Sequence, residues 1–139
     1  MKIIKAFPPN WLTLRKVFPI SGRQGIIFAY GDRIYNPSGV PLEEWVLAHE
    51  GEHCKRQNAQ GVGSWWDAYI ANPKFRLEEE VLAHCVEWKT ISDYLPPSAC
   101  ERHFARMVER LSSPLYGNLV TKEEAERLIS GRTRPRTTD

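Results

Sequence analysis

The string His49-Glu50-Gly51-Glu52-His53 places two imidazoles and a carboxylate at a spacing that suits metal chemistry. Four residues turn an α-helix by about 400°, so both histidine rings would project from one face of a helix, one turn apart. Both rings could then bind one zinc ion at about 2.0–2.1 Å. Glu50 is rotated by about 100° from His49, so it lies outside ligand range. It could still contact a water activated by the metal, which is the position of a general base.

A third ligand is predicted from the periodicity of Glu78-Glu79-Glu80. On a helix, Glu80 falls on the apolar stripe, Glu79 lies on its flank and Glu78 lies on the opposite side. A carboxylate on an apolar stripe is destabilising unless it is paired, and a metal held by two histidines of a facing helix would neutralise it. The sequence therefore predicts that His49, His53 and Glu80 bind zinc and leave one position for water, as in catalytic zinc sites.

Other interpretations of these residues are open. The two histidines of the HExxH string could be core residues bonded to the backbone. Glu80 could form an ion pair with Arg76, one helical turn before it. A closed structural zinc site could include His84 and a cysteine, because Cys54 and Cys85 each follow a histidine. Each cysteine is rotated by about 100° from the histidine before it, which disfavours that site.

Two long helices are predicted to position these side chains. The first begins at Pro41, has acidic residues in its first turn and ends before Gly61. The second has Asn72 as its N-cap and Pro73 as its first residue. The segment between them is predicted to be a loop whose aromatic side chains either pack in the core or form a substrate wall: Trp65, Trp66 and Tyr69.

Shorter elements complete the prediction. A strand at 2–7, a helix at 10–18 and a hairpin of 25–30 and 33–35 around Gly31-Asp32 precede the first long helix. Two smaller helices follow the second, each with a capping box: Ser98 with Glu101, and Thr121 with Glu124. The predicted fold class is therefore α+β, mostly helical, with a small sheet packed on the HExxH helix.

Composition limits the possible classes of protein. The chain has 139 residues, of which 42% are hydrophobic and 26% charged, which fits one globular domain at 1–131 followed by a flexible basic tail at 132–139. The net charge of +2, with basic and acidic residues interspersed, predicts no nucleic-acid partner. No apolar stretch has the length of a membrane span or a signal peptide. Three cysteines without a CxxC pair predict a reduced, cytoplasmic chain.

HEGEH at 49–53 and NPKFRLEEEVLAH at 72–84 resemble the gluzincin zinc metallopeptidases, especially small single-domain ones encoded by phages. Peptidases of the ImmA/IrrE kind have a similar HExxH and a later ExxA, here Glu80-Val81-Leu82-Ala83. The resemblance covers about 28–88 and implies a minimal zincin-like fold, with His49, Glu50 and His53 in the roles of the first motif. It also implies that a peptide lies along the hairpin at 25–37, and that the location is the host cytoplasm if a phage encodes the chain.

Three positions depart from that family pattern. Gly51 and Glu52 stand where relatives often have bulkier apolar residues, and a glycine within a helix costs up to about 1 kcal/mol. His84 stands where many gluzincins have Asp or Asn, one turn after the glutamate ligand. We expect His84 to contact a ligand side chain, to act as a catalytic hydrogen-bond donor, or to be a fourth ligand that closes the site.

The main functional hypothesis is a zinc-dependent peptidase that acts on a peptide or protein, with Glu50 as general base. A side chain would help zinc to stabilise the oxyanion, and His84 is the first candidate, followed by Tyr69, Tyr94 and Tyr116. The alternative is a zinc-stabilised, non-enzymatic binding or assembly protein, for example in phage morphogenesis, and a weaker one is a metal-free helical domain. Other divalent ions could replace zinc. Peptide addition at the Arg33–Tyr35 edge would indicate peptide binding.

Overall fold

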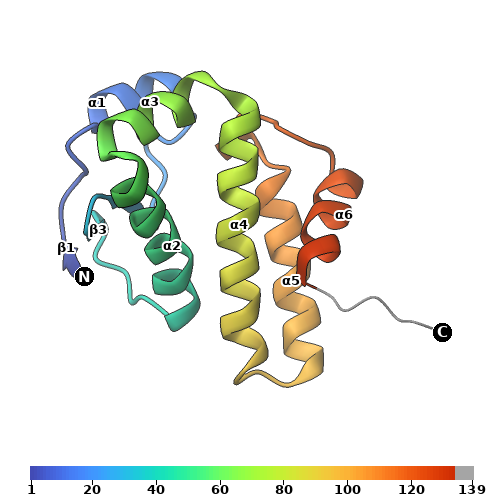
Figure 1. Cartoon of the computed structure of the whole chain (residues 1–139). Helices are drawn as coiled ribbons and strands as arrows, with labels where there is room; N and C mark the ends of the chain where they lie inside the picture. Colours follow the sequence, from blue (N-terminus) through green and yellow to red (C-terminus); the bar gives the residue numbers. More distant parts are fainter. Residues whose placement is uncertain (134–139) are drawn as a thin grey trace.

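Helices form most of the chain in this computed structural model, which describes residues 1–133 (Figure 1). The six α-helices of this part are α1 (Trp11–Val17), α2 (Glu44–Gln60), α3 (Val62–Ala71), α4 (Pro73–Ser92), α5 (Pro97–Leu111) and α6 (Lys122–Thr133). A short 3-10 helix, η1 (Pro114–Tyr116), precedes α6, and three strands form one sheet: β1 (Lys2–Ile4), β2 (Phe28–Tyr30) and β3 (Arg33–Tyr35). The predicted α+β class is confirmed.

The sheet has the order β1-β3-β2, so β3 is its central strand. β1 pairs with β3 in parallel, and β2 pairs with β3 in the antiparallel hairpin that the Gly31-Asp32 turn predicts. The prediction that a peptide could add to the Arg33–Tyr35 edge is therefore wrong, because both sides of β3 are already paired. The sheet packs on α2 through a small apolar cluster of Ala29, Ile34 and Cys54.

Helix boundaries follow the sequence signals in part. Gly61 ends α2 with a φ of 107°, which a side chain would disfavour, and its N–H donates to the Gln57 carbonyl. The predicted start of α2 at Pro41 is too early, because Glu43 is an extended N-cap residue and the helix begins at Glu44. The Asn72 carboxamide caps α4 by accepting from the N–H groups of Lys74 and Phe75 at 3.0 and 3.3 Å.

The two predicted capping boxes have different outcomes. Thr121 and Glu124 cap α6 reciprocally, since the side chain of each accepts from the backbone N–H of the other at 3.2 Å. Ser98 does not cap α5, because that helix already begins at Pro97 and Pro96 is its extended N-cap residue.

Two other predictions about chain segments are wrong. Residues 62–71 form α3 instead of a loop, because Trp65, Trp66 and Tyr69 become buried together on one side of a helix. The tail does not begin at residue 132, since Arg132 belongs to α6 and forms an ion pair with Glu78 at 2.9 Å. Residues 134–139 of the predicted tail lie outside the described residues.

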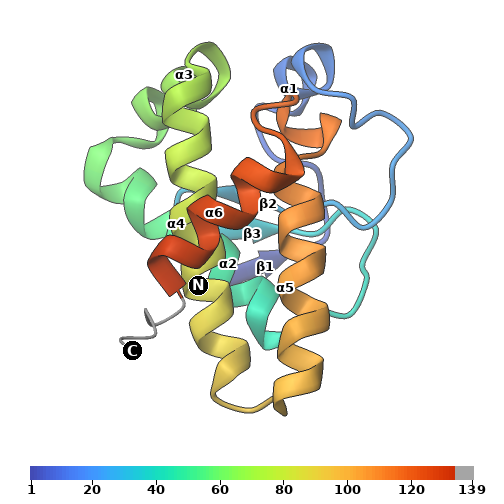
Figure 2. The ribbon, with the colours of Figure 1, turned by 90° about the vertical axis from the view of Figure 1, so that its right-hand side faces the viewer.

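The apolar core consists of two larger clusters on either side of a polar layer. The first joins α1, the β2–β3 hairpin and α3, and the second joins α4, α5 and α6. Figure 1 shows α4 between α2 and the α5–α6 pair, and Figure 2 shows α6 crossing over α4 and α5. The polar layer consists of buried side chains from α2, α4 and α5: His49, His53, Gln57, Arg76, Glu79, Glu80, His84, Glu87 and His103.

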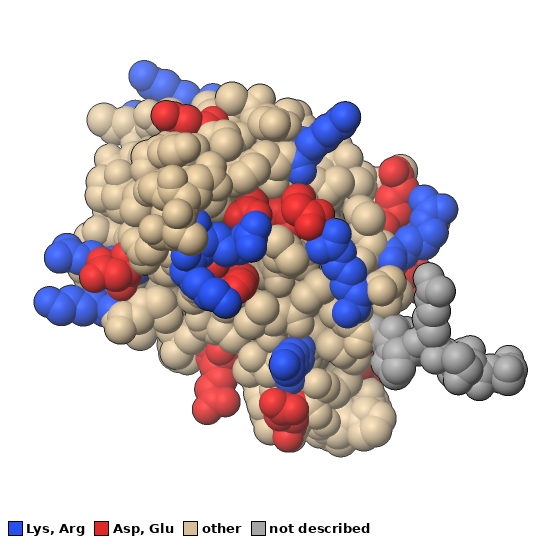
Figure 3. Space-filling model, in the orientation of Figure 1, with Lys and Arg blue, Asp and Glu red and all other residues tan. Residues whose placement is uncertain are grey.

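Two surface properties accompany this architecture. On the face seen in Figure 3, basic and acidic side chains lie beside one another, as expected for a net charge of only +2. Within residues 1–133, no helix has both the length and the apolar character that crossing a membrane requires.

Candidate metal centre

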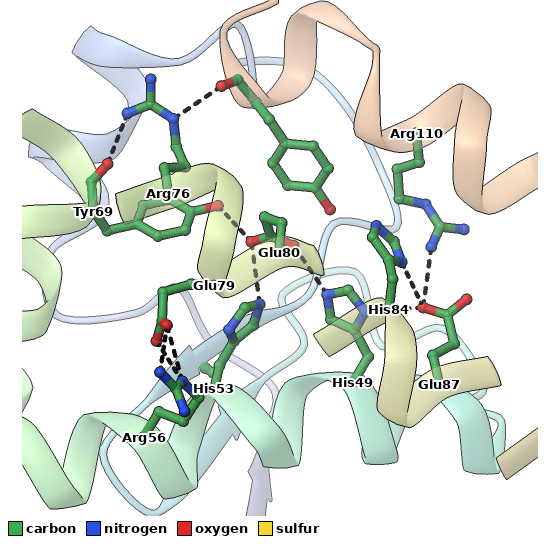
Figure 4. Close-up of polar contacts among 12 residues, drawn as sticks. His49, His53, Arg56, Tyr69, Arg76, Glu79, Glu80, His84, Glu87 and Arg110 are labelled. Carbon is green, nitrogen blue, oxygen red and sulfur yellow. Dashed lines mark hydrogen bonds and ion pairs between the residues drawn. The ribbon is translucent and has the colours of Figure 1, made fainter. Parts of the chain in front are cut away.

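Helices α2 and α4 bring together the three side chains that the sequence predicts as ligands (Figure 4). The Glu80 carboxylate lies between two imidazoles, with Oε1 3.1 Å from His49 Nε2 and Oε2 3.1 Å from His53 Nε2. One ligand atom from each residue lies within 4.8 Å of the other two. The predicted grouping of His49, His53 and Glu80 is confirmed as geometry, and two imidazoles with one carboxylate are donors that suit zinc.

Glu80 is held by Tyr69 and not by Arg76. The Tyr69 hydroxyl donates to Glu80 Oε2 at 2.6 Å. Arg76 instead donates to three backbone carbonyls, from Nη1 to Tyr69 at 2.7 Å and to Ile70 at 3.2 Å, and from Nε to Tyr116 at 2.9 Å. The alternative that Glu80 pairs with Arg76 is therefore wrong. Burial alone would raise the pKa of Glu80, but the adjacent His53 and His49 outweigh burial and hold it well below its usual value.

His49 lies between two carboxylates on opposite sides of its ring. Its Nε2 contacts Glu80, and its Nδ1 contacts Glu87 Oε1 at 2.9 Å. Because a carboxylate accepts hydrogen bonds, each of the two contacts favours a proton on the ring nitrogen that faces it, and together they favour the imidazolium form of His49. Burial would lower the pKa of His49, but the bonds to Glu80 and Glu87 outweigh it and raise the pKa to about 10. These partners are not backbone groups, which contradicts the core-histidine alternative for His49.

Glu87 forms a buried centre that the sequence reasoning missed. It accepts hydrogen bonds from His49, from His84 Nδ1 at 3.2 Å and from His103 Nε2, and Arg110 Nη1 lies 3.6 Å away. Burial would raise the pKa of Glu87, but the hydrogen bonds from His103, His49 and His84 outweigh burial and lower it. A carboxylate on the second nitrogen of a metal-binding histidine fixes the orientation of its ring. Glu87 follows Glu80 by two helical turns, and this spacing is the signal that could have identified it.

His84 lies behind His49, away from the cavities of the site. It is fully buried, and its ring centroid is 4.7 Å from that of His49. It lines neither of the two spaces that Glu50 borders. It belongs to a separate group with His49 and Glu87, and the His49–His53–Glu80 group does not include it. Of the three roles predicted for His84, the structure favours contact with a predicted ligand side chain, because His84 packs on His49 and donates to Glu87, which also contacts His49. It does not place His84 as an oxyanion donor or a fourth ligand.

Glu50 lies at the boundary of two adjacent spaces. The first, which we call the apolar cavity, has a volume of about 90 Å³ and is lined by ligand residues and by apolar side chains of α1, β2 and α3. The second, which we call the outer cleft, has a volume of about 390 Å³ and lies between α2, α5 and the segment 23–27. Burial raises the pKa of Glu50, although the charges of His49 and His53 oppose this. A carboxylate with a raised pKa at a cleft suits general-base chemistry.

The aromatic residues of α3 both pack and line the apolar cavity. Trp65 stacks on Tyr69 with centroids 4.9 Å apart and meets the His53 ring edge-on at 5.4 Å. Trp65 Nε1 also donates to Glu79, which is buried and ion-paired with Arg56 of α2. These contacts fix α3 against α2 and α4, the two helices that carry the predicted ligands.

The tyrosines predicted as oxyanion donors occupy different places. Tyr69 is already bonded to Glu80, and Tyr94 is 49% exposed and lines neither space. Tyr116, from η1, lines both the apolar cavity and the outer cleft together with His49 and Glu50. Tyr116 is therefore the predicted tyrosine that shares the lining of both spaces with Glu50.

Gln57 joins α2 to the outer edge of β2. Its Nε2 donates to the Ala29 carbonyl at 3.0 Å, and its Oε1 accepts from the Gly31 N–H at 2.7 Å. Tyr30 and Arg33 close the hairpin, so the backbone groups of Ala29 point away from β3, toward α2. The side chain thus aligns the outer strand with the helix that carries both histidines.

Two remaining sequence observations have structural explanations. The side chain of Met1 lies 3.3 Å from the point that a Cβ of Gly51 would occupy, so this helical glycine allows a close approach. Within residues 1–133, no cysteine belongs to a group that could hold a metal. Cys54 instead packs against the sheet and Cys85 against the α4–α6 cluster, which contradicts the closed structural site.

Comparison with family models, curated proteins and solved structures finds no match for this chain. The geometry of the site therefore carries the functional conclusion.

Proposed function

We propose that this protein is a zinc-dependent peptidase whose metal ligands are His49, His53 and Glu80. The observation that carries the proposal is the buried Glu80 carboxylate between two Nε2 atoms, next to a half-buried Glu50 that lines both the apolar cavity and the outer cleft. Zinc, when bound there, supplies a Lewis acid that activates water and polarises a carbonyl. The three free cysteines suit a reducing compartment, as expected for a cytoplasmic enzyme.

The side chains around the proposed ligands have separate roles in the reaction. Glu50 accepts the proton of the attacking water and returns it to the leaving amine, and its raised pKa makes it a stronger base for this exchange. Tyr116 donates a hydrogen bond to the carbonyl oxygen as that oxygen becomes negative. Tyr69 and Glu87 keep Glu80 and His49 in the orientation that the metal requires.

The outer edge of β2 supports the binding of an extended peptide. Ile27 and Ala29 line the apolar cavity beside His49 and Glu50. The N–H of Ala29 points away from β3 and is the group that a peptide could contact, because the Ala29 carbonyl already accepts from Gln57. A peptide that adds to this edge would place a carbonyl over the ligands, and an aliphatic side chain would fit the apolar cavity. The proposed peptide-binding edge is therefore β2 and not the Arg33–Tyr35 strand that the sequence suggested.

The test is the variant Glu50→Gln, with Glu52→Gln as its control on the same helix. Glu52 contacts Lys55 at 3.8 Å and is not a lining residue of either space. We expect both variants to retain one zinc per chain, and only Glu50→Gln to lose hydrolysis of an unstructured protein substrate. Hydrolysis at the wild-type rate by Glu50→Gln would refute the proposed mechanism.

A zinc-stabilised, non-enzymatic binding protein is the second candidate. It is favoured by the low exposure of the ligand side chains, since His49, His53 and Glu80 are 5%, 4% and 2% exposed. Under this alternative, zinc binds stoichiometrically and raises the melting temperature, but neither the wild type nor Glu50→Gln hydrolyses any peptide.

A further inference from the structure

Arg110 of α5 presents a positioned guanidinium to the outer cleft. Its side chain is 29% exposed, its guanidinium lies over the Trp45 ring at 5.2 Å, and Nη1 lies 3.6 Å from Glu87 Oε1. These two contacts fix the group on one side. Among residues 1–133, no acceptor lies within hydrogen-bond distance of its N–H groups. Arg110 is therefore held in place while its donors remain available.

The charge distribution of the cleft is asymmetric. Arg110 and the exposed Arg23 both line it, and Arg23 has no ion pair with any described residue. Glu50 is the sole acidic residue that the described chain contributes to the lining. A negative group of a bound molecule is therefore favoured in the part of the outer cleft that Arg110 and Arg23 line, away from Glu50.

We propose that the peptide substrate docks a carboxylate on Arg110, beside the bond that is cleaved. This inference rests on the proposed peptidase function and specifies its substrate class. A planar guanidinium with free parallel donors matches a carboxylate in a bidentate geometry that a lysine could not reproduce. The carboxylate is either the C-terminus of the substrate or an Asp or Glu side chain, and these two sources have the same chemistry at Arg110.

If the carboxylate is the C-terminus of the substrate, the place of Arg110 also sets the direction of the bound chain. Ile27 lines the outer cleft together with Arg110. Ala29 lies at the other end, where it is bonded to Gln57 in the C-terminal part of α2. A peptide whose terminal carboxylate lies at the Ile27 end therefore runs antiparallel to β2. Antiparallel pairing is slightly more stable than parallel pairing.

The test measures binding to the full-length, zinc-loaded Glu50→Gln protein by calorimetry. The three probes are acetyl-Ala-Leu-Ala-Leu as the free acid, the same peptide as its amide, and the amide with Glu in place of the third residue. We expect the free acid, the Glu-containing amide, or both to bind at least about tenfold more tightly than the plain amide. The probe that gains affinity identifies the source of the carboxylate.

Two further variants isolate Arg110. Adding Arg110→Gln to the zinc-loaded protein should reduce the preference for the carboxylate to less than about twofold. Arg102→Gln is the matched control, because Arg102 is an exposed residue of the same helix that does not line the cleft. It should leave the preference intact.

The outcomes separate this inference from the proposed function. Equal affinities of all three peptides, or a preference that persists in Arg110→Gln, would overturn the docking of a carboxylate on Arg110. If wild-type protein nevertheless cleaves such peptides, the peptidase proposal stands without it. If zinc-loaded wild-type protein cleaves none of them and binds none, the peptidase proposal fails, and the inference that rests on it fails too.

Discussion

The carboxylate of Glu87 lies 2.9 Å from Nδ1 of His49, while Glu80 contacts Nε2 of the same ring. The two carboxylates come from one helix, two turns apart, and hold the imidazole between them (Figure 4). Glu80, at Nε2, is itself a candidate ligand, whereas Glu87, at Nδ1, orients the ring from the opposite side. This arrangement leads to predictions that separate metal binding from catalysis.

Glu87→Gln should weaken zinc binding by about 10- to 100-fold, because His49 would lose the charged acceptor that fixes its ring. Titration of the protein against a zinc chelator of known affinity measures the effect. Glu78→Gln is the control, since Glu78 is an exposed residue of the same helix that pairs with Arg132. Equal zinc affinities of Glu87→Gln and the wild type would contradict the orienting role of Glu87.

Zinc binding at pH 7.5 should release about one proton from His49, because the metal needs the Nε2 electron pair. In the metal-free protein the pKa of His49 is raised to about 10, so the ring is charged at this pH. Its stabilising contribution is complete below the ordinary pKa of about 6.5 and is lost as the pH rises through 10. Calorimetry in two buffers of different ionisation enthalpy measures the released proton. A binding enthalpy that does not depend on the buffer would show that His49 is neutral before zinc binds.

Tyr116→Phe and Tyr69→Phe should have different effects. Loss of the Tyr116 hydroxyl should lower kcat by about 10²- to 10³-fold with little change in zinc affinity, as expected for an oxyanion donor. Loss of the Tyr69 hydroxyl should weaken zinc binding, because Glu80 loses a bond of 2.6 Å. Steady-state kinetics and zinc titration of both variants test this, with Tyr94→Phe as an exposed control. A normal kcat in Tyr116→Phe would remove Tyr116 from the mechanism.

Glu79→Gln should lower the free energy of unfolding by roughly 1–3 kcal/mol, because a buried carboxylate that bonds Arg56 and Trp65 loses its charge. The adjacent Glu78→Gln should cost less than about 1 kcal/mol, since its ion pair with Arg132 is exposed. Urea unfolding of the metal-free proteins compares the two variants directly. Equal losses would mean that burial of the Glu79 pair adds nothing.

The sequence was sufficient where local periodicity decides the outcome. The helical spacing of His49 and His53 and the place of Glu80 on an apolar stripe predicted a cluster that the structure confirms as geometry. Asn72 and Thr121 predicted helix starts correctly, because a cap depends on residues within one turn. The helical spacing, the apolar stripe and the caps need no knowledge of distant parts of the chain.

Features that depend on long-range packing were not predictable in the same way. His103 reaches Glu87 from α5, and no local pattern relates these two positions. The central place of β3 arises from its parallel pairing with β1, which is far away in sequence. The helix at 62–71 forms although Gly63 and Ser64 disfavour it, because burial of its aromatic residues outweighs weak helix propensity.

The polar layer between the two apolar clusters makes the folding of this molecule depend on solution conditions. Each cluster is held by apolar contacts that acid does not alter, whereas the α2–α4 interface contains buried histidines and carboxylates. Acid that protonates Glu80 and Glu87 would therefore weaken the contact between α2 and α4 before it affects the apolar contacts among α4, α5 and α6. The amides of α4, α5 and α6 would then retain slow hydrogen exchange after those of α2 have lost it.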